Sequence, residues 1–321
     1  MKAIWVEKGK LKLVKLPKPR PKKGEVLIRV LYAGICNTDL EIVRGYMDFQ
    51  GILGHEFIGI VKKGSSKWLG KRVVGEINLA CGRCEYCQKG LSRHCPHREV
   101  LGILKKPGAF AEYLTLPEKN LHLVPDSISD LEAVFIEPLS ASLRILDQLK
   151  IKKQDKVLIL GDGKLAQLIA RVLALKTKEL LVAGRHQEKL ALLSRLGIKT
   201  ILAEELSKFT PEHSIELIIE ATGNPEGLKT ALKFIAPLGT IVLKSTYAKE
   251  PQIDLSQVVV NELKILGSRC GDFSQAIPLL EKNKVPVKDL ISGIYPLEEY
   301  QKAFRKAQER KSLKVVFKCQ S

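Results

Sequence analysis

The chain has 321 residues, more than one hydrophobic core usually supports, so we expect two domains. Apolar residues make up 45% and charged residues 27%, as in ordinary globular proteins, and no stretch approaches the roughly eighteen uninterrupted apolar residues of a membrane-spanning helix. The 53 basic and 35 acidic residues give a net charge of +18, which leaves a nucleic-acid partner open. The basic residues are scattered apart from 18–23, without interleaved aromatic residues, so we expect a lysine-rich solvated surface, no nucleic-acid partner and no membrane association.

The first residues, 1–13, contain no apolar core followed by a cleavage site. We therefore expect no secretory signal and a cytoplasmic protein, in which disulfides are rare.

Three residues of metal-ligand type lie close together in the N-terminal part of the chain: Cys36, His55 and Glu56. A catalytic zinc site needs about three protein ligands of the Cys, His or carboxylate type and one open position. An isolated histidine is more often a polar residue with ordinary partners than a ligand, but this set of three favours a metal. Glu137 stands in an otherwise apolar stretch, where an unpaired carboxylate would be costly and a metal would account for it.

Four cysteines follow within residues 81–95, at Cys81, Cys84, Cys87 and Cys95. Cysteines three residues apart along a tight loop can direct their sulfurs at one centre, as tetrahedral zinc requires. Disulfides are the alternative, and the expected compartment argues against them. His94 could compete with Cys95, although four thiolates are the simpler set. Because four filled positions leave no room for a substrate, we predict a structural zinc ion.

An apolar run of strand length at 157–160 leads into Gly161, Gly163 and Ala166. This is the G-x-G-x-x-A arrangement of dinucleotide-binding folds, in which the glycines allow a tight turn and a close approach of the backbone to the pyrophosphate. The following helix would receive the phosphates at its N-terminus. Further apolar runs alternate with helical segments and predict a doubly wound parallel sheet, with strands near 179–183, 199–202, 215–220, 239–243 and 263–267.

The end of the second strand should indicate which cofactor is bound. An NAD site usually has Asp or Glu there, on the ribose 2′-hydroxyl, whereas Gly184 and Arg185 stand at this point, followed by His186 and Lys189. An acid would repel a 2′-phosphate, whereas arginine can bind one through two hydrogen bonds. A basic surface cluster is the alternative, but the missing acid leads us to predict NADP(H) in preference to NAD(H).

The order of these motifs resembles that of the zinc-dependent alcohol dehydrogenases of the medium-chain dehydrogenase/reductase family. GAFAEY at 108–113, EPLSAS at 137–142, EATG at 220–223 and the segment 295–318 extend the resemblance over essentially the whole chain. The resemblance implies a GroES-like β-barrel catalytic domain, formed by 1–140 and 276–321, and a Rossmann domain at 141–275.

The resemblance also implies roles for the candidate metal ligands. Cys36 and His55 would bind the catalytic zinc, with Glu56 a ligand or a close neighbour of one. Glu137 falls where enzymes of the ethanol type carry a ligand cysteine. A glutamate at this position is similar to sorbitol, threonine and glucose dehydrogenases, which favours a polyol-like or sugar-like substrate.

Three residues of the segment after Cys36 take roles in the same resemblance. Thr38 matches the hydroxyl that relays the substrate proton, and Asp39 would support the metal ligands. Glu41 stands where many members have the histidine that ends the proton relay, so this chain departs from the usual relay.

The cofactor contacts that the resemblance implies are Gly161, Gly163, Leu165, Thr222, Gly223, Arg269 and Lys314. The first three would lie against the pyrophosphate, and the last two would contact phosphate groups.

The implied activity is reversible hydride transfer between an alcohol, polyol or sugar, or the matching carbonyl, and NADP(H), with one catalytic and one structural zinc ion per chain. The family forms homodimers and homotetramers, so we expect one of these. A zinc-free reductase on the same fold would lack the metal ligands, and a non-catalytic NADP(H)-binding structural or regulatory protein would have lost part of them. A zinc-ribbon nucleic-acid binder would leave most of the chain unexplained.

Overall fold

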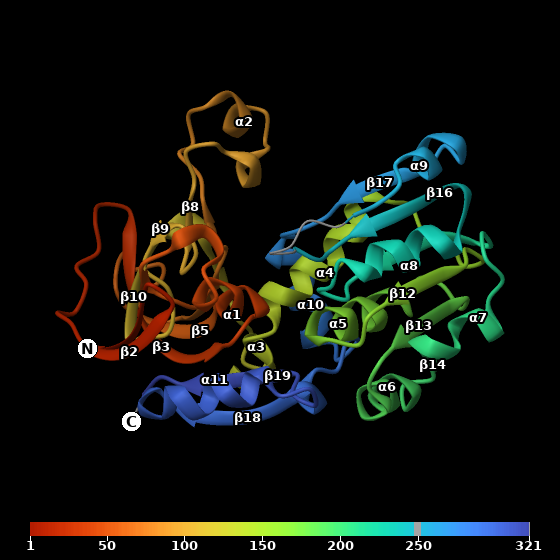
Figure 1. Ribbon diagram of the computed structural model, residues 1–321. Coiled ribbons are helices and arrows are strands. Elements are labelled where there is room, and N and C mark those ends of the chain that lie inside the picture. Colours follow the sequence, from red (N-terminus) through yellow and green to blue (C-terminus); the bar gives the residue numbers. More distant parts are fainter. Residues whose placement is uncertain (247–251, 321) are drawn as a thin grey trace. The chain divides into compact units, whose positions relative to one another are not determined.

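The computed structural model describes residues 1–246 and 252–320. The chain divides into two compact units (Figure 1): a split unit, Met1–Glu137 with Phe273–Ser321, and a central unit, Pro138–Asp272. The sequence placed these boundaries at 140 and 275.

Parallel strands form the sheet of the central unit. In the part of the chain that the structure describes, the strand order is β14-β13-β12-β15-β16-β17, which is the order of the dinucleotide-binding doubly wound fold. The predicted sheet is therefore confirmed. Its strands are β12 (Val157–Leu160), β13 (Leu180–Gly184), β14 (Lys199–Leu202), β15 (Ile215–Glu220), β16 (Ile235–Leu243) and β17 (Lys264–Gly267).

One strand begins earlier than the sequence indicated. β16 starts at Ile235 and not near 239, because Ile235 pairs with Ile215 directly after the helix that ends at Phe234. A register irregularity follows between Ile215 and Leu217, and the regular pairing resumes at Thr240. The sequence pattern detected only the regular part of this strand.

Antiparallel pairing dominates the split unit. Its largest sheet has the order β11-β6-β5-β3-β19-β18, with β10 also paired to β3. Two smaller sheets have the orders β2-β1-β4 and β7-β8-β9. The strands are β1 (Lys2–Glu7), β2 (Lys10–Lys15), β3 (Glu25–Gly34), β4 (Gly51–Ile52), β5 (Glu56–Lys63), β6 (Arg72–Gly75), β7 (Asn78–Leu79), β8 (Glu99–Leu101), β9 (Lys105–Lys106), β10 (Tyr113–Pro117), β11 (Leu121–Leu123), β18 (Ile291–Pro296) and β19 (Lys314–Lys318).

Both ends of the chain contribute to this largest sheet. β19 pairs antiparallel with β3, with Val316 opposite Gly34, so residues from the two ends of the chain become neighbours. The Phe110 and Phe317 rings meet edge to face, with their centroids 5.0 Å apart, and Phe304 lies 6.1 Å from Phe110. These buried rings join the two segments of the split unit.

The helices lie mostly in the connections between strands. They are α1 (Asn37–Val43), α2 (Glu85–Gln88), α3 (Asp130–Ala133), α4 (Ile136–Gln148), α5 (Lys164–Leu173), α6 (Gln187–Ser194), α7 (Leu206–Phe209), α8 (Glu226–Phe234), α9 (Ser256–Val260), α10 (Phe273–Glu281) and α11 (Tyr300–Gln308). Among the described residues, no helix combines the length and apolar character needed to cross a membrane.

Truncating the ring that joins the two segments should destabilise the split unit. We expect Phe110→Ala to lower its unfolding free energy by about 3–5 kcal/mol, because the fully buried ring would leave a cavity between Phe304 and Phe317. Differential scanning calorimetry measures the effect. Phe209→Ala is the matched control because Phe209 is 71% exposed, and equal losses in both variants would contradict the assignment.

Candidate metal centres and cofactor loop

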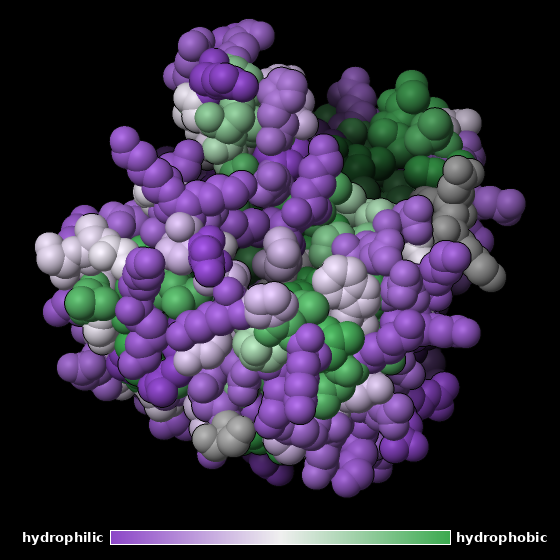
Figure 2. Space-filling model, turned by 90° about the vertical axis from the view of Figure 1, so that its left-hand side faces the viewer, coloured by the Kyte–Doolittle hydropathy of each residue, from purple (hydrophilic) through white to green (hydrophobic). Residues whose placement is uncertain are grey.

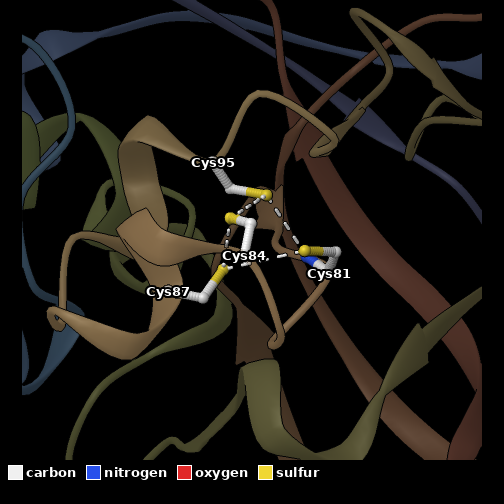
Figure 3. Close-up of side chains that lie close together, drawn as sticks. All are labelled: Cys81, Cys84, Cys87 and Cys95. Carbon is white, nitrogen blue, oxygen red and sulfur yellow. Dashed lines mark hydrogen bonds between the residues drawn. The ribbon is translucent and has the colours of Figure 1, made fainter.

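Four cysteine sulfurs converge in the loop between β7 and β8 (Figure 3). The Sγ atom of Cys84 lies 3.5 Å from the Sγ atom of Cys87 and 3.7 Å from that of Cys95. The Sγ atoms of Cys81 and Cys87 are 4.0 Å apart. Zinc–sulfur bonds of about 2.3 Å directed to a tetrahedron separate the sulfurs by about 3.8 Å. The observed spacing fits a zinc ion and is far too long for a disulfide, whose sulfurs lie about 2.05 Å apart.

The electrostatics of this loop favour a metal cation. Backbone N–H groups, first that of Arg83, lower the pKa of Cys81 to about 6. The N–H of Cys87 also favours the Cys84 thiolate, but burial and the neighbouring sulfurs outweigh it and raise the pKa of Cys84 to about 11. Because adjacent thiolates repel each other, a dication would allow all four to ionise together. His94 is not in this four-residue cluster of the described residues.

A second cluster brings together Cys36, His55 and Glu56, whose ligand atoms all lie within 4.8 Å of one another. Cys36 is the N-cap of α1, Glu56 is the first residue of β5, and His55 directly precedes it. β5 pairs with β3, with Glu56 opposite Gly34, so the strand pairing carries the two residues to the cysteine.

The buried Asp39 carboxylate orients this cluster. Its Oδ2 accepts a hydrogen bond from the Cys36 backbone N–H at 2.8 Å, and its Oδ1 accepts one from Gly54 N–H at 3.2 Å. Oδ1 also lies 3.5 Å from His55 Nδ1. Burial lowers the pKa of His55, but Asp39 and Cys36 outweigh burial and raise it well above its ordinary value. The imidazole therefore stands in a negative environment that attracts cations.

Two buried polar atoms of the cluster test whether it suits a metal. Among the described side chains, Glu56 Oε1 and His55 Nδ1 are buried without a hydrogen-bond partner. A buried carboxylate oxygen without a partner is costly. Cysteine, histidine and carboxylate are zinc ligands, so the residues fit a zinc ion, which would compensate the Glu56 charge.

Lys314 forms a buried ion pair with a residue of this second cluster. Its side chain is 1% exposed, and its ammonium group forms an ion pair with Glu56 Oε2 and lies 5.7 Å from the centre of the Phe135 ring. Burial lowers the pKa of Lys314, but the charges of Glu56, Cys36 and Glu137 raise it overall. Lys314 therefore lies beside the metal cluster because β19 pairs with β3, and its contact with a phosphate group stays a prediction.

Glu137 lies in the first turn of α4 and is half-buried. It is not one of the three residues whose ligand atoms lie within 4.8 Å of one another, but its charge acts on the Lys314 ammonium. Thr38 Oγ1 lies 3.7 Å from Cys36 Sγ. Glu41 lies about one turn of α1 beyond Thr38. Its carboxylate accepts a hydrogen bond from the Arg44 guanidinium at 2.7 Å and so has a cationic partner.

The glycine loop of the central unit has the backbone that a dinucleotide site requires. Gly161 has φ +119°, and a Cβ there would lie 2.5 Å from the Ala221 carbonyl oxygen. Gly163 is the N-cap of α5, next to open space, and Leu165 lies in the first turn of α5. This turn leaves the backbone accessible at the helix N-terminus, where phosphates bind.

The other predicted cofactor residues lie at the carboxyl ends of the central strands. Thr222 follows β15 and donates a hydrogen bond to Glu220 Oε1 at 2.6 Å. Gly223 N–H donates to Ser245 Oγ at 2.8 Å. Arg269 is exposed after β17, and its carbonyl oxygen accepts a hydrogen bond from Lys244 at 3.3 Å.

The segment after β13 contains an interaction that the sequence did not indicate. The Asp162 carboxylate accepts hydrogen bonds from the backbone N–H groups of Arg185, at 2.6 Å, and His186, at 2.8 Å. Gly184 ends β13, and the buried Lys189 lies in α6. A carboxylate therefore lies where the strand itself has none.

Two family models match the chain: the alcohol dehydrogenase GroES-like domain over residues 22–126 and the zinc-binding dehydrogenase over 163–282. A 2-dehydro-3-deoxy-L-galactonate 5-dehydrogenase of Pseudoalteromonas atlantica is 30% identical over 301 residues, which cover 88% of each chain. A sorbitol dehydrogenase of Halalkalibacterium halodurans is 28% identical over 320 residues, 94% of this chain and 93% of that protein.

Solved structures agree over almost the full length. A zinc-binding dehydrogenase of Sinorhizobium meliloti 1021 bound to NADP superposes with a TM-score of 0.90 at 26% identity and covers 98% of both chains. An alcohol dehydrogenase of Escherichia coli CFT073 complexed with NADH also gives 0.90, at 28% identity and 99% coverage of both.

Removing one sulfur should empty the cysteine cage. We expect Cys84→Ser to lower bound zinc by about one ion per chain, because a serine hydroxyl is a poor zinc ligand. Plasma mass spectrometry of purified protein measures the zinc. Trypsin should then cleave the variant within residues 81–95, since we expect the metal to order this loop.

Cys270→Ser is the control, since Cys270 belongs to neither cluster of described residues. Unchanged zinc in Cys84→Ser, or an equal loss in Cys270→Ser, would count against the cage.

Proposed function

Since the chain belongs to the zinc-binding dehydrogenases of the medium-chain family, and is thus an oxidoreductase of alcohols, we propose that it transfers hydride reversibly between a polyol-like or sugar-like alcohol and NADP(H). The observation that carries the proposal is the buried cluster of Cys36, His55 and Glu56, with a carboxylate oxygen that lacks a partner. The identity of Glu137 and the similarity to sorbitol dehydrogenase support the polyol class.

In this proposal Cys36 and His55 hold zinc, with Glu56 and Glu137 as the nearby carboxylates. Zinc bound there would supply Lewis-acid polarisation of the substrate oxygen. Asp39 keeps the Cys36 backbone and the His55 ring in position through its two oxygens. Lys314 holds Glu56 Oε2 and offsets part of the negative charge, so that Glu56 Oε1 is the oxygen available to a cation.

The substrate proton leaves through α1 in the same proposal. The Thr38 hydroxyl receives the proton of the substrate hydroxyl and passes it toward Glu41, three residues further along the helix. The hydrogen bond from Arg44 orients the Glu41 carboxylate. Hydride chemistry itself belongs to the nicotinamide, which the central unit would bind through Gly161, Gly163 and the N-terminus of α5.

Two zinc ions per chain, one in each cluster, are part of the proposal. The NADP(H) preference rests on the lack of an acidic residue at Gly184 and on Arg185. Four thiolates that bind metal need a reducing compartment, which supports a cytoplasmic location.

We further propose a homodimer or homotetramer formed through the edge of the central sheet. β17 is one of the two edge strands of the described sheet, and in the segment before it Leu255, Val259 and Val260 are each more than 60% exposed. Figure 2 shows hydrophobic surface gathered at its upper right, against an otherwise largely hydrophilic face. An exposed edge strand with apolar neighbours is suited to pairing with a second copy.

Replacing either expected zinc ligand should separate catalysis from cofactor binding. We expect Cys36→Ser and His55→Ala to lose at least about a thousandfold in turnover of a polyol substrate, because the metal would be lost. NADPH affinity, measured by fluorescence titration, should stay within about twofold of the unaltered chain, since the glycine loop lies in the central unit.

Full turnover in both variants would overturn the zinc mechanism. Tight NADPH binding without turnover of any alcohol by the unaltered, zinc-loaded chain would favour the non-catalytic NADP(H)-binding protein. Lys311→Gln serves as a control for changes of charge in the split unit that leave the metal cluster intact.

A charge on the apolar patch should disrupt the oligomer. We expect Val260→Asp to convert the dimer or tetramer into a smaller species, because the 78% exposed side chain would be buried against a second copy. Light scattering coupled to size-exclusion chromatography gives the mass. Phe209→Asp alters another highly exposed apolar residue, 71% exposed, and should leave the mass unchanged; a monomeric unaltered chain would refute the interface.

A further inference from the structure

The carboxyl end of β13 is the place where a dinucleotide fold distinguishes its cofactors, because the ribose 2′ position lies there. In this chain a buried carboxylate reaches that point from the glycine loop. Asp162 is 6% exposed, and its Oδ2 accepts hydrogen bonds from Arg185 N–H and His186 N–H. The His186 ring completes the contacts, with Nδ1 3.0 Å from Oδ2 and 3.1 Å from Oδ1.

Gly184 makes room for this arrangement. A Cβ atom at position 184 would lie 2.6 Å from Asp162 Cβ and 2.7 Å from Asp162 Oδ2, closer than real side chains approach. An acidic side chain at position 184 would therefore clash with Asp162 in its observed position. The strand end has no acid of its own, and the Asp162 carboxylate lies directly beside it.

The carboxylate changes how much positive charge this end of the strand can offer. Asp162 occupies two backbone N–H groups at the start of α6, which would otherwise be donors for an anion. Lys189 is 7% exposed, and burial lowers its pKa, although the charges of Asp162 and Glu188 oppose the shift. Arg185 is exposed, so its guanidinium can turn toward a phosphate.

We propose that Asp162 is a specificity-determining residue: its buried negative charge, and its hold on the Arg185 and His186 backbone N–H groups, limit the affinity for the 2′-phosphate of NADP(H). The NADP(H) preference is then set by the opposition between Asp162 and Arg185. This inference rests on the proposed function only in assuming that a nicotinamide dinucleotide binds the glycine loop.

The test removes the charge and keeps the shape. In Asp162→Asn, the side-chain oxygen can still accept the two backbone hydrogen bonds, so the turn should be preserved. We expect Asp162→Asn to bind NADPH at least about tenfold more tightly, with NADH affinity within about twofold, because a like charge beside the 2′-phosphate is removed. Fluorescence titration of the full chain with each cofactor measures both affinities.

Calorimetric binding of 2′,5′-ADP and 5′-AMP gives a second readout without the nicotinamide. The gain should appear with 2′,5′-ADP and be missing with 5′-AMP. Asp155→Asn is the matched control: it removes the same charge within the central unit, at a half-buried residue whose carboxylate accepts a hydrogen bond from the nearby Lys152 N–H at 2.8 Å. We expect Arg185→Gln to bind NADPH more weakly than the unaltered chain does.

Asp162→Ser removes the charge with a smaller side chain and serves if the Asn variant does not fold. Unchanged NADPH affinity, or an equal loss for both cofactors, would overturn the inference and leave Asp162 as a support of the loop. If the unaltered chain prefers NADH and the ratio still moves toward NADPH in the variant, the NADP(H) preference fails but the role of Asp162 stands.

Discussion

One largely buried region of the split unit contains four negative or ionisable side chains, those of Cys36, Asp39, Glu56 and Glu137. Uncompensated charge is costly in such a region. The rest of the split unit can be understood from this constraint. Backbone N–H groups of Cys36 and Gly54 satisfy Asp39, and the ammonium group of Lys314 satisfies one oxygen of Glu56. The remaining oxygen and the His55 ring are left for a cation. The pairing of β3 with both β5 and β19 is what allows these residues to meet.

Local patterns predicted the features whose parts lie close together in the sequence. The spacing of the four cysteines indicated that their sulfurs would converge, and the apolar strand before Gly161 indicated the turn that the structure has. The sheet of the central unit followed from alternating apolar runs, because each strand of a doubly wound sheet carries its own signal. The barrel unit had no such signal, and its two segments came from a resemblance to a family.

Interactions over long sequence distances could not be read from the pattern. Nothing in the sequence around Lys314 identifies Glu56 as its partner, since 258 residues separate them and only the pairing of β19 with β3 brings them together. The sequence pattern of an NAD site has its acidic residue at the end of β13 itself. Asp162 lies 22 residues before Gly184, and its side-chain direction depends on the turn at Gly161. The lack of an acidic residue at Gly184 therefore does not show that no carboxylate is near, because a neighbouring loop can supply one.

The split of the catalytic unit between the two ends of the chain has a consequence for its synthesis. The ribosome releases β3 and the candidate ligands Cys36 and His55 before the central unit, whereas β19, which pairs with β3, emerges after it. The central unit is complete before then and can fold on its own schedule. The largest sheet of the split unit is complete only once β19 has emerged, so until then the nascent chain carries Cys36, His55 and Glu56 without the lysine that pairs with Glu56. The emergence of β19, and not that of the candidate ligands, is therefore the event that completes this sheet.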